Sequence, residues 1–352
     1  GKCSERFVGG SVSTPIVGFH KDVACLDFNS LYPSIIIAYN IDYHTLINPE
    51  YYHDMDNDPE TKKIWGDPYD KDTNPNGKWH KIICPEGDRT YEYRYVTKTF
   101  AGDIGLLPRN AVNLLATRKI AKGEMAKCEY GSVEYKLADA KQLAVKIVNN
   151  SAYGFLMAPG NWASIECGRS VTAKGRELKL LVEVIIREKY GGIVIYGDTD
   201  SVMYQIPGCK TTEEAYAFSM MLEKEISAMM IKGLTLEMEK LGYFFSLKPK
   251  HYIYWPYDIK NHRFALKKDN YTPDYLIRGV VSTKRDRAKS HIKIFEHIYD
   301  TIMKAGLVKN ADELLGYLWQ ATIDIYFGAR GIVDVDDKGV PVQRMEIAYK
   351  RG

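Results

Sequence analysis

The stretch IVIYGDTDSVMYQI, Ile193–Ile206, decides the fold. Two β-rich apolar runs flank the segment Gly-Asp-Thr-Asp, which is the pattern of a β-hairpin with a polar tip. Residues two apart on a strand point the same way, so Asp198 and Asp200 would face one side together. Two carboxylates this close raise each other's pKa unless a positive charge neutralises them, and Mg²⁺ prefers such oxygen ligands. An isolated Asp-Thr-Asp is more often a solvated turn.

A third acid strengthens the interpretation of Asp198 and Asp200 as metal ligands. Asp27 ends its own apolar run, VACLDF (Val23–Phe28), as a carboxylate at a strand end would. The alternative is an ordinary N-cap of the helix that follows. Three carboxylates from two strand ends could hold two Mg²⁺ ions, and two metals stabilise both oxygens of an in-line phosphoryl displacement.

Length and composition indicate an ordinary globular protein. The 352 residues are enough for two or three structural modules, with 45% apolar and 26% charged residues. No run of about 18 apolar residues predicts a transmembrane helix, and no signal peptide opens the chain. The six cysteines are scattered without a CxxC pair, which favours a reducing compartment, cytoplasm or nucleus, over a disulfide framework or zinc site. The net charge of +3 says little about nucleic acid.

The first half of the chain has four distinct parts. Residues 1–47 have the pattern of strands that feed a helix. Residues 48–100 are rich in Asp, Asn, Pro and Gly, which predicts turns and loops in a surface insertion. Helical patterns then cover 108–130 and about 137–155, and their short connection predicts an antiparallel helical hairpin.

The second half alternates helices and strands. A helix is predicted over 172–190, before the opening hairpin, and another over 212–232. Residues 243–267 have the pattern of aromatic strands. Apolar spacing predicts amphipathic helices over 288–306 and 311–328.

The two helices of the predicted hairpin each present a cationic face. Arg118 and Lys122 are four apart, and Lys146, Asn150 and Tyr153 follow at i, i+4 and i+7, so each set shares one face. Arg clamps phosphate bidentately and Lys adds a point charge, which suits a triphosphate. For either helix alone, a solvated face is the simpler explanation.

Four ordered motifs resemble those of the B-family, or α-like, DNA polymerases. They are DFNSLYPSI (Asp27–Ile35), KIVNNSAYG (Lys146–Gly154), YGDTDS (Tyr196–Ser201) and KHY (Lys250–Tyr252). The similarity spans roughly residues 9 to 290. It implies an α+β right-hand polymerase fold with a β-sheet palm, antiparallel helical fingers and a mainly helical thumb.

The resemblance also implies domain limits. The palm would comprise residues 1–105, with the polar insertion at 48–100, and residues 158–262. The fingers would be 106–157, and 263–352 an incomplete thumb. Since the family's usual proofreading exonuclease would not fit ahead of Asp27, we expect a polymerase core of a longer or split protein. The short form weakly favours a virus or phage as its source.

The implied chemistry is nucleotidyl transfer. Asp27 and Asp200 would be the main ligands of two Mg²⁺ ions, which Mn²⁺ could replace, with Asp198 in support. Glu239 is either a further acid near the metals or a solvated charge on a helix or strand. Tyr32 would stack beneath the deoxyribose and exclude a 2′-hydroxyl, although without the resemblance it is an ordinary core aromatic. The residues implied to bind the dNTP are Phe28, Asn29, Ser30, Leu31, Tyr32, Arg118, Lys122, Lys146, Asn150 and Tyr153.

The implied partners are primer–template DNA and dNTPs. Lys250 and Tyr252, two apart on a strand, would point together into the minor groove, whereas as a lone pair they would be a surface Lys beside a packed Tyr. A basic cluster that begins at Arg278 would grip the duplex backbone, or form a solvated helix face. The residues implied to bind DNA are Gly154, Lys250, Tyr252, Arg278, Lys284, Arg285 and Arg287. A separate exonuclease-bearing or remaining polymerase chain and a processivity factor are further candidates, and no membrane is expected.

The sequence thus predicts a template-directed DNA polymerase that extends a primer 3′-hydroxyl by two-metal phosphoryl transfer. One alternative is a catalytically inactive, polymerase-like subunit that binds DNA or serves as a scaffold. Another is an RNA polymerase, although these carry Gly-Asp-Asp where this chain has Gly-Asp-Thr-Asp.

Overall fold

The computed structural model divides the chain into two compact units. It describes residues 8–99, 101–157, 163–267, 272–280, 296, 298–303, 334–335 and 341–342. The first unit comprises Gly1–Ser13, Ala24–Cys209 and Tyr216–Glu239. The second comprises Thr14–Val23, Lys210–Ala215 and Lys240–Gly352. Both contain strands and helices, so the predicted α+β class is confirmed.

The predicted hairpin is present in the first unit. Strands β4 (Ile193–Gly197) and β5 (Ser201–Gln205) are antiparallel, and the Asp198 amide donates to the Ser201 carbonyl at 3.0 Å to close the tip. β5 also pairs antiparallel with β1 (Gly18–Phe28), and β6 (Leu236–Lys248) lies next to β1 in the same sheet. Ala, Cys and Leu side chains of β1 are buried, which explains why this apolar run is a central strand.

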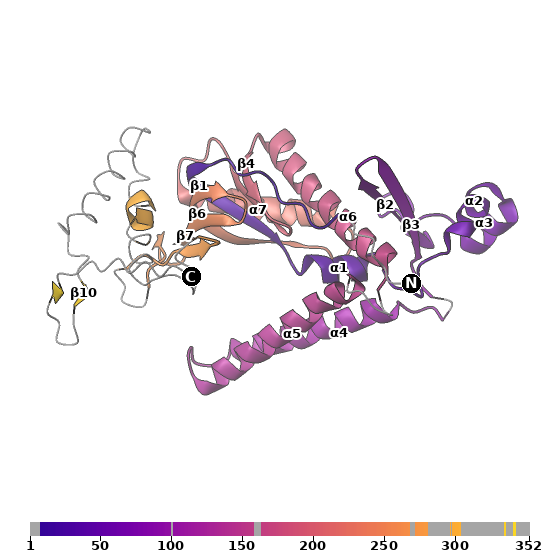
Figure 1. The fold of residues 1–352 in the computed structure, drawn as a ribbon, viewed down its shortest axis with the longest axis horizontal. Helices are drawn as coiled ribbons and strands as arrows, with labels where there is room; N and C mark the ends of the chain where they lie inside the picture. Colours follow the sequence, from indigo (N-terminus) through magenta and orange to yellow (C-terminus); the bar gives the residue numbers. More distant parts are fainter. Residues whose placement is uncertain are drawn as a thin grey trace, which may run out of the picture. The chain divides into compact units, whose positions relative to one another are not determined.

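The helices of the first unit include the predicted antiparallel pair. After β1 comes α1 (Leu31–Ala38). Helices α4 (Leu106–Met125) and α5 (Val133–Met157) lie side by side and run in opposite directions (Figure 1). The hairpin is confirmed, although α5 begins about a turn earlier than its apolar pattern indicated.

Helix α6 (Ile165–Val184) precedes the β4–β5 hairpin and continues as a π-helical turn, Ile185–Lys189. Its Ser164 N-cap accepts a hydrogen bond from the Cys167 amide at 3.2 Å, which satisfies one free N–H of the first turn. Helix α7 (Thr212–Met229) confirms the helix predicted over 212–232.

The prediction of turns and loops over residues 48–100 holds for residues 66–78 and is wrong for most of the rest. This segment contains a 3₁₀ turn and helices α2 and α3, followed by an antiparallel hairpin of β2 and β3. The bounds are Pro49–Tyr51, Tyr52–Asn57, Pro59–Trp65, Trp79–Glu86 and Arg89–Val96.

Tertiary contacts explain this difference. The Arg94 side chain is 2% exposed, donates to both carboxylate oxygens of Asp56 at 2.8 and 2.6 Å, and stacks on the Trp79 ring at 4.6 Å. Asp58, which composition assigned to a turn, caps α3 by accepting from the Thr61 amide at 2.8 Å. Composition does not reveal a core built around a buried cation.

The second unit confirms aromatic strands within residues 243–267. Strand β6 pairs antiparallel with β7 (His251–Asp258). Strand β7 also pairs antiparallel with β8 (Arg263–Phe264) and with β9 (Leu276–Arg278). Ile253, Tyr299 and Met303 form its buried core. Of the predicted helix over 288–306, residue 296 and residues 298–303 are described and helical. The predicted helix over 311–328 lies outside the described residues.

Two short strands, β10 (Asp334–Val335) and β11 (Pro341–Val342), form a separate antiparallel pair. Among the described residues, none of the helices has the length and apolar character needed to cross a membrane.

Candidate active site

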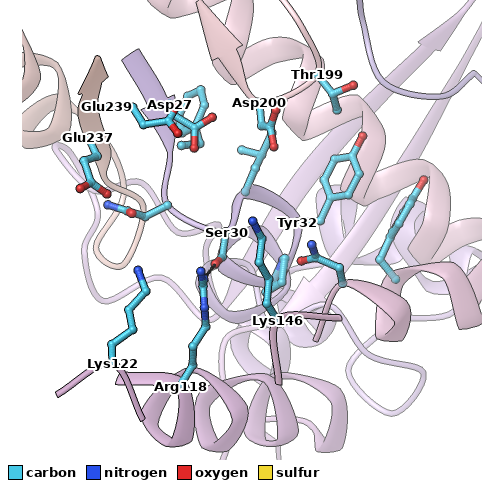
Figure 2. Close-up of a pocket in the computed structure, with 16 residues that line it drawn as sticks. Asp27, Ser30, Tyr32, Arg118, Lys122, Lys146, Thr199, Asp200, Glu237 and Glu239 are labelled. Carbon is cyan, nitrogen blue, oxygen red and sulfur yellow. Dashed lines mark hydrogen bonds between the residues drawn. The ribbon is translucent and has the colours of Figure 1, made fainter. Parts of the chain in front are cut away.

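A pocket of about 570 Å³ in the first unit collects the chemistry-bearing residues. Its walls come from the end of β1, the start of α1, helices α4 and α5, the hairpin tip and β6 (Figure 2). The lining residues are Asp27, Phe28, Asn29, Ser30, Leu31, Tyr32, Pro33, Arg118, Lys122, Lys146, Asn150, Tyr153, Thr199, Asp200, Glu237 and Glu239. Every residue predicted to bind the nucleotide is among them.

Strand pairing brings two of the predicted acids into this pocket. Asp27 lies opposite Ser201 in the β1–β5 register, and the Phe28 amide donates to the Asp200 carbonyl at 2.8 Å. Paired strands lie about 4.8 Å apart, so residues distant in sequence become neighbours here. In Figure 2, Asp27 lies beside Glu239, and Asp200 points into the same space.

The Asp200 carboxyl is electrostatically disfavoured as an anion. Its pKa is raised, first because the surrounding protein atoms exclude water from it, and then because Asp198 and Glu239 are negative; Lys146 opposes the shift. The side chain nevertheless keeps an exposed surface on the open side of the pocket. A divalent cation at this carboxylate would relieve the repulsion.

Asp198 lies outside the pocket lining. Its carboxylate accepts a hydrogen bond from the Thr199 amide at 2.9 Å, an arrangement that stabilises the hairpin tip. Within the described part of the chain, no group of three or more His, Cys, Asp or Glu side chains is arranged to hold a metal ion. The structure therefore brings together Asp27 and Asp200 but does not assemble the predicted set of three.

Cations face these acids from the other side of the pocket (Figure 2). Arg118 and Lys122 come from α4, and Lys146 comes from α5. The Arg118 guanidinium donates to the Ser30 hydroxyl at 3.4 Å and to the Gln142 side-chain oxygen at 3.3 Å, which ties α4 to α1 and α5. A polyanion bound between the two sides would meet three positive charges at one end and, at the other, four carboxylates, those of Asp27, Asp200, Glu237 and Glu239.

The Tyr32 ring forms a wall that its neighbours hold in place. It packs on Tyr153, with ring centroids 4.4 Å apart and planes inclined by 43°. A Cβ atom at Gly175 would lie 3.1 Å from the ring, and one at Gly10 would lie 2.8 Å from its hydroxyl. Burial, with the charge of Asp200, raises the pKa of Tyr32 to about 12, so the hydroxyl keeps its proton at neutral pH.

A buried lysine that the sequence analysis did not single out supports the hairpin. Lys179 of α6 is 2% exposed, and its ammonium donates to the Gly197 carbonyl at 3.2 Å, the Ser13 hydroxyl at 2.9 Å and the Ser11 carbonyl at 3.0 Å. Glu183 lies 3.6 Å from it. A Cβ at Gly197 would come within 2.6 Å of the Lys179 side chain, so this approach requires glycine. Only tertiary packing joins these residues.

Lys179→Met is therefore expected to destabilise the fold by about 3 kcal/mol, because the buried Glu183 loses one of its two cationic partners and keeps only Arg187, and two carbonyls lose their donor. Burial lowers the pKa of Lys179, and the negative charges of Glu183 and Asp198 oppose that shift. These two acids therefore stabilise the positive charge of the Lys179 ammonium. Urea denaturation would measure the loss. Lys189→Met removes an exposed ion pair with Glu225 and should cost much less, because solvent screens it. Equal losses in the two variants would contradict the role given to Lys179.

Glu237 is a pocket acid that the sequence analysis missed. It precedes Glu239 by two residues in LEMEK, on β6, and both line the pocket. The period-two alternation of a strand would have placed both on one face. That rule was applied to the Asp198–Asp200 pair but not here.

Three residues of the second unit were predicted to contact DNA, and they lie in different surroundings: Lys250 in a turn, Tyr252 buried and Arg278 exposed. The prediction that Lys250 and Tyr252 share a strand is wrong, because Lys250 lies in the turn between β6 and β7 with φ of 63°. Gly279 approaches this turn so closely that a Cβ would lie 2.1 Å from the Lys250 carbonyl. Tyr252 is buried against Phe244, with centroids 5.2 Å apart, and lies opposite the exposed Arg278.

The remaining predicted DNA contacts are tested little by the structure. A Cβ at Gly154 would meet no atom of the described residues within 4 Å. Lys284, Arg285 and Arg287 lie outside the described residues, and their role stays a prediction.

Known proteins resemble this chain over most of its length. A model of the family described as DNA polymerase family B matches residues 1–330. The DNA polymerase delta catalytic subunit of Dictyostelium discoideum is 35% identical over 295 residues, which cover 79% of this chain and 24% of that subunit. The subunit of the same name from Oryza sativa subsp. japonica is 34% identical, over 71% of this chain and 21% of its own length. That from Drosophila melanogaster is 28% identical, over 91% and 27%.

The chain therefore spans about a quarter of the length of these curated relatives. They are eukaryotic proteins and give no support to the prediction of a virus or phage as the source.

Proposed function

Because the chain belongs to DNA polymerase family B, we propose that it forms the core of a template-directed DNA polymerase. The primer 3′-hydroxyl would attack the α-phosphate of a dNTP, forming a phosphodiester bond and releasing pyrophosphate. One observation carries the proposal: a single pocket sets Asp27 and Asp200 opposite Arg118, Lys122 and Lys146. That arrangement suits a triphosphate held at its far end by cations and at its reacting end by carboxylates.

The side chains of the pocket would divide the work. Arg118, Lys122 and Lys146 would bind the β- and γ-phosphates and orient the leaving group. The carboxylates of Asp27 and Asp200 would hold the divalent ions, for which their hard oxygen donors are suited. Bound Mg²⁺, or Mn²⁺ in its place, would supply the positive charge that stabilises the attacking and leaving oxygens.

Asp198 would act differently from the other two acids. Its contact with the Thr199 amide supports the shape of the hairpin tip, so its part would be to position Asp200. Asn150 and Tyr153 would shape the space for the nascent base pair, beside the phosphate-binding face of α5. Lys250, Tyr252 and the basic segment from Arg278 onwards would contact the primer–template duplex.

The proposed domain division follows the chain. Residues 1–105 and 158–262 would form the palm, since they contain β1 and the β4–β5 hairpin. The pair α4–α5 within 106–157 would be the fingers, and residues 263–352 would belong to the thumb. An antiparallel pair of helices that carries the phosphate-binding cations suits closure over a correct base pair before chemistry.

Primer extension tests this function directly. With a labelled primer–template, all four dNTPs and Mg²⁺, the chain should lengthen the primer. EDTA should abolish the reaction until excess Mg²⁺ restores it, because without a divalent cation the carboxylates of Asp27 and Asp200 repel the triphosphate. Duplex binding without extension under any divalent ion would identify the alternative, a catalytically inactive, polymerase-like DNA-binding subunit.

A further inference from the structure

A second pocket, of about 930 Å³, lies in the first unit and takes no part in the chemistry above. Ala38, at the C-terminal end of α1, lines it. Leu31 and Tyr32, at the N-terminal end of the same helix, line the candidate active site. Eight residues of α-helix span about 12 Å, so the two pockets are separated by roughly the length of α1.

The charged side chains that line this second pocket are positive. Three lysines line it, Lys78, Lys98 and Lys232, and of the described residues in its wall none is Asp or Glu. All three are exposed or half-buried, and none forms an ion pair with another described residue. Such a wall attracts an anionic ligand.

Glu50 and Asp70, the acids adjacent in sequence to Tyr51 and Tyr69 of the second pocket, accept hydrogen bonds from the Asn48 side chain and from the Asp72 and Thr73 amides. Two further acids nearby in sequence are ion-paired. Asp67 lies 3.7 Å from the Lys62 ammonium, and Asp72 lies 2.7 Å from that of Lys71. They therefore do little to offset the lysines of the second pocket.

Aromatic rings lie among these cations. Tyr51 is 46% exposed, and its ring centroid lies 6.2 Å from that of the half-buried Trp65, with planes inclined by 33°. The half-buried Tyr69 ring, also in the pocket wall, packs on His80 with ring centroids 4.8 Å apart. Burial lowers the pKa of His80 to about 4, so it contributes a neutral ring at pH 7. Exposed and half-buried rings in a wall that also carries lysines are a combination that can bind unpaired bases by stacking and their phosphates by charge.

We propose that the second pocket binds single-stranded nucleic acid, namely the unpaired template strand on its way to the candidate active site. The location of this strand rests on the proposed function, whereas single-strand binding itself does not. At about 3.4 Å per stacked nucleotide, the length of α1 corresponds to roughly three or four nucleotides between the two pockets. Tyr51 and Trp65 would stack on bases, and Lys78, Lys98 and Lys232 would contact phosphates.

Fluorescence anisotropy with a labelled oligothymidylate of about ten nucleotides tests the proposal on the full chain without dNTPs. Tyr51→Ala should weaken binding roughly 5-fold or more, because one stacking surface is lost. The double variant Lys98→Ala, Lys232→Ala should weaken binding and lower the slope of log K against log salt by about 1.4, since each phosphate contact to a single strand contributes about 0.7.

A matched control removes the same charge nearby. Lys63 and Lys71 are ion-paired to Glu60 and Asp72 and lie outside the second pocket, so Lys63→Ala, Lys71→Ala should bind as the wild type does. Thermal melting of each variant checks that it folds. Wild-type affinity in the Tyr51 variant, or an equal loss in both lysine pairs, would overturn the proposal, because binding would then be general electrostatic attraction.

The proposed function can fail separately from this site. If the wild-type chain does not extend a primer but binds oligothymidylate in a way that depends on Tyr51 and the two lysines, the polymerase assignment falls and the single-strand site stands. If extension is normal and binding ignores these residues, the site falls and the polymerase assignment stands.

Discussion

Asp200→Asn is expected to reduce primer extension by about 10³-fold or more, a loss of the size caused by removing one preorganised charge-stabilising group. Asp200 is the carboxylate that the hairpin tip presents to the pocket, and the amide keeps its shape but not its charge or its metal affinity. Single-turnover extension at saturating dNTP and Mg²⁺ would measure the loss. Activity within a few-fold of wild type would remove the proposed mechanism.

Asp198→Asn is the matched comparison for Asp200→Asn. Asp198 lies outside the pocket lining, and its contact with the Thr199 amide can be kept by an Asn side-chain oxygen. We therefore expect a much smaller loss than for Asp200→Asn. Equal losses would show that Asp198 acts on the reacting groups itself.

Stability should move in the opposite direction from activity in Asp200→Asn. The pKa of Asp200 is raised in the folded chain by exclusion of water and by Asp198, so the folded state holds its proton more tightly than the unfolded state, where the pKa is about 3.9. The stabilisation from this carboxyl is complete below the unfolded value and is lost as pH rises through the higher folded value. At pH 7 the uncharged amide should leave the melting temperature equal to or above that of the wild type, so lost activity would not reflect unfolding.

Tyr32→Ala should lower the preference for dNTPs over NTPs by roughly 10²-fold. The Tyr32 ring is held against Tyr153 and beside Gly175, so it is a fixed wall that cannot move aside for a 2′-hydroxyl. Alanine opens that space. Comparing kcat/KM for a dNTP and the matching NTP, on the same primer–template, measures the change.

Tyr32→Phe separates the ring from its hydroxyl. It keeps the packing on Tyr153 and removes only the oxygen near Gly10, so selectivity should stay close to that of the wild type. Free use of NTPs by the wild-type chain, or loss of selectivity in the Phe variant, would contradict exclusion by the ring.

Local pattern determined the parts of the fold whose residues are close in sequence. The hairpin of β4 and β5 follows from two apolar runs around Gly-Asp-Thr-Asp, and the α4–α5 pair follows from helical spacing and a short connection. The lining of the candidate active site was also predictable in large part, since the motifs that carry the resemblance contribute most of it.

The sequence pattern did not predict interactions between segments that are distant in the chain. Residues 48–100 were predicted as loops, but Arg94 closes a small core there with Asp56 and Trp79. Lys250 and Tyr252 were predicted to point together, but a turn at Lys250 and the packing of Tyr252 separate them.

By itself the sequence determined the strand and helix types outside residues 48–100, the family motifs and the identity of the acids and cations, because these depend on spacing along the chain. Tertiary structure alone decided that Asp198 turns to the hairpin backbone while Asp200 enters the pocket, and that Lys179 supports their strand from α6. The physical reason is that burial, hydrogen-bond partners and the field at a carboxylate are set by neighbours more than a hundred residues away, such as Ser13 for Lys179.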